Sequence, residues 1–496
     1  MADAQAEAAK LESNLGSEDS QRPAIFERPT VWQRIYYHPV LQVALLGLVC
    51  FMCPGMFNAL TGLGGGGQLT TTIQANANSA LYSTFAFFGF FSGTINNRLG
   101  PRLTLTLGTS GYCLYIASFL IAKIYPGAGS FVVTSGAILG VCASLLWTAQ
   151  GSLMMSYPTE AQKGVFIGMF WAILSLGGVV GSAVAFGQNF NSTAGSVGNG
   201  TYITFMILSV VGVVLTFFMA DPNKMIRTDG TKVAQPSHPS WKTEFVNLFV
   251  ALKKDPWIVL LFPMFFASNY FYTWQFNDYN AAIFTIRARG LNNLVYSTAQ
   301  IFSSIFIGYV ILDQKRYRRR VRAFIGWVLV FAMVFVVHIW AYFYQRTYTR
   351  QSVSPATDID IYSSDYPAHV CIMIFYGFLD SMWQTYAYWL MGTMSNNLTK
   401  LAVFTGFYKS LQSSGAAGVW RADGVGLPYM NILLSTWTLT AAGMVFALPV
   451  VYFRVQDHTE EEKSERLVML MRHVCRITLT FVSVSVSSAV RVCKTT

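Results

Sequence analysis

A series of apolar runs, each about as long as a bilayer is thick, is the feature that most constrains this chain. A helix needs about 20 mostly apolar residues to span a membrane. Only 11% of the 496 residues are charged, against about 25% in a soluble domain, so the chain lacks the polar surface of a water-soluble globule. We therefore predict an all-α integral membrane protein. The twelve predicted spans are 40–60, 79–96, 103–123, 131–156, 165–187, 202–220, 256–274, 295–312, 321–343, 368–391, 401–419 and 430–453.

The longest polar connection divides these spans into two groups of six. We expect residues 40–220 to form a first six-helix half and residues 256–453 a second, joined by a cytosolic middle loop at 221–255. Residues 1–39 are expected to be a cytosolic tail, mostly disordered because its first thirty residues are polar and acidic. Residues 454–496 are expected to be a second cytosolic tail. Its apolar part is short for a span and interrupted by serines, which favours a disordered tail or a misread gene end over a membrane-surface segment.

Basic residues predict which loops face the cytosol, because positive charge is retained on that side of a membrane. With the N-terminus inside, the inner loops hold Lys163 and the dense basic run 315–322. The outer loops at 61–78 and 188–201 carry no charge. The net charge of +11 is therefore a topology signal and not a sign of nucleic-acid binding. Both termini are expected in the cytosol, and the particular membrane is left open.

One of the uncharged outer loops contains two N-glycosylation sequons, at Asn191 and Asn199. Such tripeptides arise by chance in polar stretches, but both of these fall on the side that the loop charges place outside. We expect glycans at these two asparagines. A third sequon, at Asn397, lies in a cytosolic loop and is expected to stay unmodified.

The glycine cluster Gly62–Gly67 matches the dinucleotide-binding fingerprint G-x-G-x-x-G, which requires a preceding strand and a later acidic residue. Here the preceding apolar run, 43–60, is too long for a strand, and the downstream segment 82–89 has no carboxylate. The chain also shows no P-loop, metal-ligand spacing or nucleophile–base pair. We therefore predict no enzyme, no cofactor, no metal site and no nucleic-acid partner. The glycines favour tight packing at the end of the first helix, with a flexible gate as the alternative.

A loop motif between the second and third predicted spans resembles a signature of the major facilitator superfamily. The segment Gly93-Thr-Ile-Asn-Asn97-Arg98-Leu-Gly100-Pro101-Arg102 is similar to that superfamily's G-x-x-x-D-R-x-G-R-R/K loop. The resemblance implies a twelve-helix facilitator fold, and it predicts a cytosolic gate loop. Asn97 stands where the family has an aspartate, which removes the charge that a relay gate at this position would use. The predicted gate residues are Gly93, Asn97, Arg98, Gly100 and Arg102.

Three further segments resemble the Unc-ninety-three-like branch of this superfamily, in its fungal form. They are Trp147–Trp171, Gly377–Asn396 and Phe404–Gly418. The branch has no settled substrate, and some of its animal members are regulators of ion channels or escorts of receptors. The resemblance therefore implies the fold more firmly than the function.

An internal repeat relates the two groups of spans. Pro54 and Asn58 in the first span correspond to Pro263 and Asn269 in the seventh, and paired proline interruptions point to a transporter's central site. In the facilitator fold, helices 1, 4, 7 and 10 line that site, and an amide-and-aromatic lining suits a neutral or amphipathic organic solute. Interhelical hydrogen bonds and packing are the structural alternative. The candidate lining residues are Asn58, Gln150, Asn269, Trp274, Gln275, Trp383 and Gln384.

Asp380 is the one carboxylate that the predicted spans place deep in the membrane. An ionised aspartate at the bilayer centre costs about 2.5 to 3.5 kcal/mol on insertion scales, so something must offset that cost. Two interpretations stay open: binding of a proton or a cationic substrate, or a structural hydrogen bond or ion pair with Lys409.

The expected function is secondary transport of a small organic solute by alternating access, with proton coupling through Asp380 as an option. Its partners would be membrane lipid and a small-molecule substrate. One alternative is a non-transporting regulator with a protein partner. Another is an accessory or efflux protein of a fungal secondary-metabolite pathway.

Overall fold

The computed structural model describes residues 31–67, 71–191, 196–230, 233, 256–353, 358–396 and 398–457. Most of the two expected tails and of the middle loop therefore lies outside the described residues, as does the sequon at Asn397. The described helices belong to one unit that ends at Asp457. The sections below concern that unit.

Twelve long helical segments make up the described chain, and each coincides with a predicted span, so the all-α architecture is confirmed. A short helix, α2 (Val31–Tyr36), precedes them. The first group is α3 (Pro39–Met52) with α4 (Pro54–Gly62), α5 (Thr72–Leu99), α6 (Pro101–Ile124), α7 (Gly129–Ser156), α8 (Lys163–Asn189) and α9 (Asn199–Thr216). The second group is η5 (Pro256–Leu261) with α11 (Phe262–Ala267) and η6 (Trp274–Ala281), α12 (Ile286–Ile305) with η7 (Phe306–Leu312), α13 (Arg319–Gln345), α14 (Tyr366–Met394), α15 (Leu398–Gly424) and α16 (Tyr429–Pro449) with η9 (Val450–Arg454).

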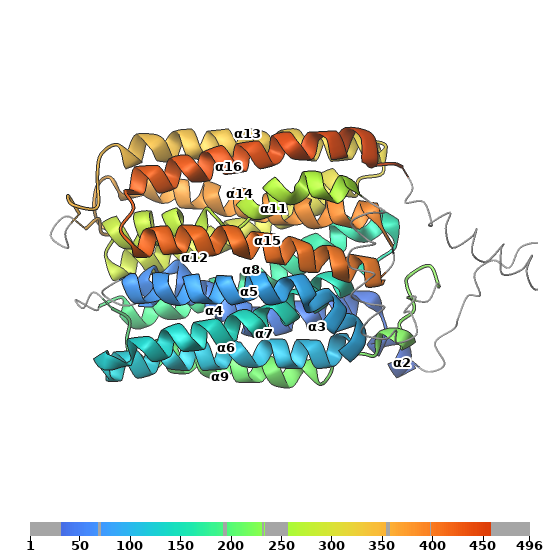
Figure 1. Cartoon of the computed structure of the whole chain (residues 1–496), viewed down its shortest axis with the longest axis horizontal. Helices are drawn as coiled ribbons and strands as arrows, with labels where there is room; N and C mark the ends of the chain where they lie inside the picture. The colour runs from blue at the N-terminus through green and yellow to red at the C-terminus, as the bar shows by residue number, and fades with distance from the viewer. Residues whose placement is uncertain are drawn as a thin grey trace, which may run out of the picture. The chain divides into compact units, whose positions relative to one another are not determined.

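The two groups lie side by side with their helices roughly parallel to one long axis (Figure 1). They meet along two seams, where α5 packs against α15 and α8 packs against α12. Small residues allow this close approach. A Cβ atom added at Gly93 of α5 would lie 2.9 Å from the carbonyl oxygen of Ala402, and one added at Gly308 of η7 would lie 2.5 Å from that of Gly164.

Eight of the segments are long and apolar enough to cross a membrane by length and composition. Among the described helices, α5, α14 and α15 have the length but are too polar for that criterion, and the η5–α11–η6 segment is broken. These four segments all contribute side chains to the cavity described below. Their polar residues include Asn269, Gln384, Lys409 and Gln412, which line that cavity.

The prolines that suggested a repeat both lie in the first turn of a helix, where a missing N–H costs no hydrogen bond. Pro54 begins α4 directly after the break at Cys53. Pro263 is the second residue of α11, and the backbone then leaves regular helix between Ala267 and Trp274. Asn58 and Asn269 follow these two prolines, and both line the same cavity.

Candidate functional site

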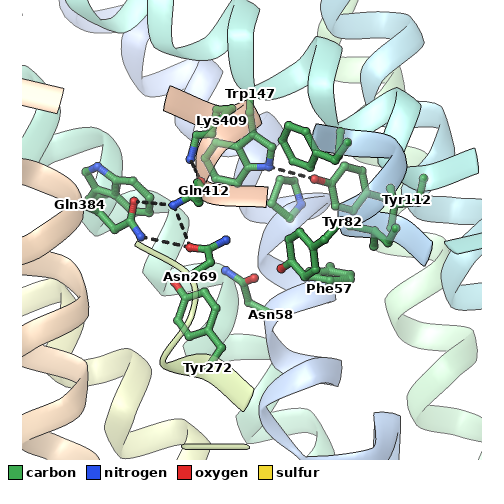
Figure 2. Close-up of a pocket in the computed structure, with 16 residues that line it drawn as sticks. Phe57, Asn58, Tyr82, Tyr112, Trp147, Asn269, Tyr272, Gln384, Lys409 and Gln412 are labelled. Carbon is green, nitrogen blue, oxygen red and sulfur yellow. Dashed lines mark hydrogen bonds between the residues drawn. The ribbon is translucent and has the colours of Figure 1, made fainter. Parts of the chain in front are cut away.

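A cavity of about 50 Å³ lies where the two groups face each other near the middle of the bundle (Figure 2). The lining residues are Pro54, Phe57, Asn58, Leu81, Tyr82, Phe85, Tyr112, Leu139, Ala143, Trp147, Trp171, Asn269, Tyr272, Gln384, Lys409 and Gln412.

One wall of the cavity is a group of linked amides from three segments of the second group (Figure 2). Gln412 Nε2 donates to Asn269 Oδ1 at 2.8 Å, and Gln384 Nε2 donates to the Ser268 carbonyl at 3.0 Å. Tyr408 donates its hydroxyl hydrogen to Gln384 Oε1 at 2.5 Å. These bonds fix the orientation of the amides, so their remaining donor and acceptor sites form a defined polar surface.

The opposite wall comes from the first group and is mainly aromatic. Trp147 stacks on Trp171 with ring centroids 6.1 Å apart, and its indole N–H donates to the Tyr112 hydroxyl at 3.1 Å. Tyr82 lines the cavity beside them. Asn58 is the polar exception on this side, and its side chain is exposed to the cavity.

Lys409 is the one charged residue of the lining, and 3% of its surface is exposed. Its ammonium donates to Gln412 Oε1 at 2.7 Å and lies 4.5 Å from the ring centre of Trp147 and 4.8 Å from that of Tyr408. Cation–π contacts of this kind stabilise a desolvated ammonium by about 2 kcal/mol. The side chain is thus held between an amide and aromatic faces.

Asp380 lies outside the lining, behind Tyr272, with 1% of its surface exposed. The Tyr272 hydroxyl donates to the carboxylate at 2.9 Å, the Tyr296 hydroxyl donates to Oδ2 at 2.8 Å, and Gln300 Nε2 donates to Oδ2 at 2.6 Å. Among the described residues, Asp380 and Lys409 share neither a hydrogen bond nor an ion pair. The expected ion pair is therefore absent, because neutral donors already surround the carboxylate.

Four predicted lining residues do not line the cavity. The Trp274 indole N–H donates to Gln345 Oε1 at 2.6 Å, so this ring packs inside the second group. Gln150 accepts from Tyr388 at 3.3 Å and does not reach the cavity. Trp383 is fully buried and does not line the cavity, although the next residue, Gln384, does. Consecutive residues on a helix point about 100° apart. Gln275 is likewise buried away from the cavity.

The sequence analysis missed several lining residues because it considered helices 1, 4, 7 and 10 alone. The structure adds α5, α6, α8 and α15, which contribute Tyr82, Tyr112, Trp171 and Gln412. A sequence signal existed for Gln412, since it is three residues after Lys409 and therefore on the same helix face.

The predicted gate loop joins α5 to α6 at one end of the bundle, which we call the basic end. Gly100 connects the two helices with φ +82°, and the Arg102 guanidinium donates to the Met219 carbonyl. Across this end, the Lys163 ammonium at the start of α8 donates to the carbonyls of Gly392 and Ser395 at 2.5 and 2.9 Å. A gating role for Gly93, Asn97, Arg98, Gly100 and Arg102 stays a prediction.

The other end, which we call the glycine end, is closed by the cluster that resembled a nucleotide site. Gly64 to Gly67 all have positive φ, between 62° and 74°. The Gly65 N–H donates to Asn277 Oδ1 at 3.2 Å, and Asn280 Nδ2 donates to the Gly62 carbonyl at 2.8 Å. The loop is therefore packed tightly against η6, as the sequence favoured.

Two carboxylates at the glycine end are also buried, a feature that the sequence analysis missed because its spans ended at 274 and 419. Asp278 is 0% and Asp423 5% exposed. Arg350 donates to Asp423 at 2.5 Å and to Asp278 at 3.4 Å, and Asn277 Nδ2 donates to Asp423 Oδ2 at 2.8 Å. Asp380 is thus one of three deeply buried carboxylates among the described residues.

Two carboxylates outside the spans have shifted pKa values. Burial raises the pKa of Asp313, which follows η7 at the basic end, to about 6, although the N–H of Val165 donates to it at 2.7 Å. At the glycine end, the hydrogen bond from Arg287 lowers the pKa of Asp360 to about 2. Asp313 therefore titrates nearer to physiological pH than Asp360 does.

The sequons at Asn191 and Asn199 lie at the glycine end, and both asparagines are exposed. Asn199 begins α9, and Asn191 follows the end of α8. Their modification stays a prediction, as does the side of the membrane that this end faces.

Comparison with known proteins places this geometry in a family. The family model described as "Ion channel regulatory protein UNC-93" matches residues 74–479. An UNC93-like protein of Schizosaccharomyces pombe is 45% identical over 90% of this chain and 89% of its own length. UNC93-like protein 1 of Arabidopsis thaliana is 38% identical over 92% and 98%. A notoamide biosynthesis cluster protein of Aspergillus versicolor is 26% identical over 78% and 83%.

Among solved structures, the proton:xylose symporter XylE of the major facilitator superfamily aligns with a TM-score of 0.59 at 12% identity, over 86% of this chain and 97% of that one. At that identity the likeness concerns the fold alone. The chain is a multi-pass membrane protein with the major facilitator fold, and it belongs to the UNC-93 family.

Proposed function

We propose that the protein is a secondary transporter that moves a small organic solute across its membrane by alternating access. The observation that carries this proposal is the central cavity, which both groups of helices line with polar and aromatic side chains. Separate sets of contacts join the two groups at the basic end and at the glycine end. A site enclosed between two gates is what alternating access requires.

Proton coupling through Asp380 is part of this proposal. Tyr272 supports it, because its ring lines the cavity while its hydroxyl donates to the Asp380 carboxylate. A proton arriving from the cavity can therefore reach the carboxylate through one hydroxyl group. Protonation would also weaken the hydrogen bonds from Tyr296 and Gln300, and so link the proton to the packing of α12 against α14.

The experiment compares metabolites in cells with the gene, without it, and with a variant of the cavity. We expect one small organic solute to change in level when the gene is removed, and the Gln384→Leu variant to reproduce that change. Gln150→Leu is the matched control, since Gln150 is a glutamine of the first group, is similarly buried at 0% exposed against 1% for Gln384, and lies away from the cavity. An unchanged solute profile in all strains would contradict the proposal.

Asp380→Asn then tests the coupling with the identified solute in proteoliposomes. The amide keeps the shape of the side chain but cannot titrate. We expect loss of gradient-driven accumulation with exchange of solute retained. Accumulation equal to that of the unchanged protein would remove proton coupling through Asp380 and leave transport itself standing.

The family description favours a second candidate, a membrane regulator that acts on an ion channel. In that case the cavity would have no transport role, and neither Gln384→Leu nor Gln150→Leu would change the solute levels of the cells. A channel current that depends on the protein, with no solute difference, would support this alternative. The name of the Aspergillus relative also keeps an accessory role in a biosynthetic pathway as an option, in which the affected solute would be a product of that pathway.

A further inference from the structure

We infer that Lys409 is the binding point for a carboxylate, so that the transported solute is a small organic monoanion with a flat apolar body. This inference rests on the proposed transport function and names the class of its substrate.

The charge of the cavity is the first support. Lys409 is the one basic side chain that lines it, and no acidic side chain lines it, so any charge of the lining is positive. Asp380 is withheld from the cavity behind Tyr272 and is already held by hydroxyl and amide donors. A cationic solute would meet a like charge in this site, whereas an anion would complete an ion pair.

The unfilled hydrogen-bonding capacity of Lys409 is the second support. An ammonium group has three donors, and Gln412 accepts the one hydrogen bond that the structure assigns to it. The other near neighbours are the rings of Trp147, Tyr408 and Tyr388, which offer faces and no anion. A buried ammonium without an anionic partner is unfavourable, and a carboxylate on the cavity side would supply that partner.

The remaining walls define the body of the solute. Trp147 and Trp171 stack on each other, and with Phe57 and Tyr82 they form an apolar surface across from the amides. Flat aromatic or conjugated groups pack well on such rings. Asn58 faces the cavity from this side and can bond a second polar group of the solute. A single cation suits a monocarboxylate better than a doubly charged phosphate.

Ligand binding to the purified full-length protein in nanodiscs tests the inference. The probes are benzoate, phenylacetate and indole-3-acetate, each paired with its neutral amide, together with phenethylamine as a cation. Binding is followed by quenching of tryptophan fluorescence and by the shift in melting temperature. We expect at least one carboxylate to bind and its amide to bind about 10-fold more weakly or worse, because the charged hydrogen bond is lost.

Substitutions at the site separate binding from folding. Lys409→Gln should lower the affinity for the carboxylate by about 10- to 100-fold, and Lys409→Arg should retain part of that affinity. Gln412→Glu puts a carboxylate oxygen where the amide oxygen of Gln412 now accepts a hydrogen bond from the Lys409 ammonium at 2.7 Å. We expect this variant to melt at a higher temperature and yet to bind the anion more weakly, since the internal carboxylate competes with it. Lys400→Gln, on the same helix and outside the cavity lining, is the control and should change neither measurement.

Other outcomes overturn the inference. Equal carboxylate binding in Lys409→Gln, or preference for the amides or for phenethylamine, would exclude Lys409 as the anion site. Binding of none of the carboxylates would also exclude it. If Gln384→Leu still alters the solute profile of cells in that case, transport stands and only the anionic substrate class fails. If it does not, both proposals fail together.

Discussion

At the basic end, the buried contact between the two groups of helices involves the charge of Lys163, whereas at the glycine end the buried contacts are neutral hydrogen bonds and the hydrogen bond from Arg421 to Asn76 is exposed. Lys163 donates from α8 to backbone carbonyls at the end of α14, and Asp313 accepts from the backbone of α8. At the glycine end, amides of η6 bond to backbone groups of the glycine loop, and Asn293 Nδ2 donates to the Ala59 carbonyl. The ion pairs that Arg350 forms there with Asp278 and Asp423 lie within the second group.

This difference bears on how easily each end opens. A neutral hydrogen bond contributes about 0.5–1.5 kcal/mol and a charged one about 1.5–3 kcal/mol. Opening the glycine end breaks several small, similar contacts, while opening the basic end removes the Lys163 ammonium from its acceptors. We therefore expect the glycine end to open more readily in the absence of solute.

The largest effect is expected from Lys163→Met. Lys163 is 2% exposed and donates to two carbonyls and to Asn396 Oδ1 across the seam. Removing the ammonium leaves these acceptors unsatisfied, which should destabilise the closed basic end by about 3–5 kcal/mol. Maleimide labelling of Met155→Cys, buried next to this contact, should rise at least 10-fold in a background where alanine replaces the native cysteines. Lys400→Met serves as the control, and equal labelling in both variants would refute the role of Lys163.

The second prediction concerns Gly64→Ala at the glycine end. Gly64 has φ +69°, and a Cβ there would lie 2.4 Å from the Phe276 carbonyl oxygen. Strain and overlap together should destabilise the closed loop by about 2–4 kcal/mol. Labelling of Leu63→Cys should then increase, while Gly127→Ala at the same end, where a Cβ meets open space, should leave it unchanged. If both alanine variants label alike, the tight loop is not what closes this end.

A smaller effect is expected from pH at the basic end. Burial raises the pKa of Asp313 to about 6, so the closed end takes up a proton at a pH where an exposed aspartate stays ionised. By linkage, the free energy that favours closure should increase by about 1–2 kcal/mol as pH falls from 7 to 5, and it should stay level above pH 7, where Asp313 is ionised in both states. Labelling of Met155→Cys between pH 5 and 8 measures this slope. Asp313→Asn should abolish the slope, and a slope that persists would assign it to another group.

The smallest expected effect is the loss of glycan mass from the protein, with no change in its stability. If the glycine end faces outward, glycosidase treatment should shift the mobility of the protein, and Asn191→Gln combined with Asn199→Gln should remove that shift without changing its stability. Labelling of the middle loop at 221–255 on intact cells would place the basic end outside and reverse the assignment of the two ends.

The sequence predicted the helices well because a span is set by length and apolarity, which are local properties. Each predicted span coincides with an observed segment, although α12 begins at Ile286, nine residues before the prediction. Its first residues include Arg287 and two asparagines, which a hydropathy pattern assigns to a loop. Their partners, such as Asp360, lie far along the chain and cannot be recognised from one segment.

The cavity was predicted only in part, because it depends on rotation about each helix axis. Asn58, Asn269 and Gln384 line it, whereas Trp383, one residue away from Gln384, does not. The sequence also offered an ion pair of Asp380 with Lys409 as one of its two interpretations, because Lys409 was the nearby cation. Three neutral donors on neighbouring segments bind Asp380 instead, and tyrosine and glutamine carry no charge that would identify them as its partners.

The polarity of α5, α14 and α15 also affects how the chain enters a membrane during synthesis. Each is long enough to span, yet each carries side chains that lipid alone would not accommodate. Asp380 and Lys409 lie on α14 and α15, which follow each other in the chain. We therefore expect these two helices to leave the translocation channel together, shielded by α12 and α5, so that buried polar residues such as Asp380 and Lys409 delay insertion until their neighbours have arrived.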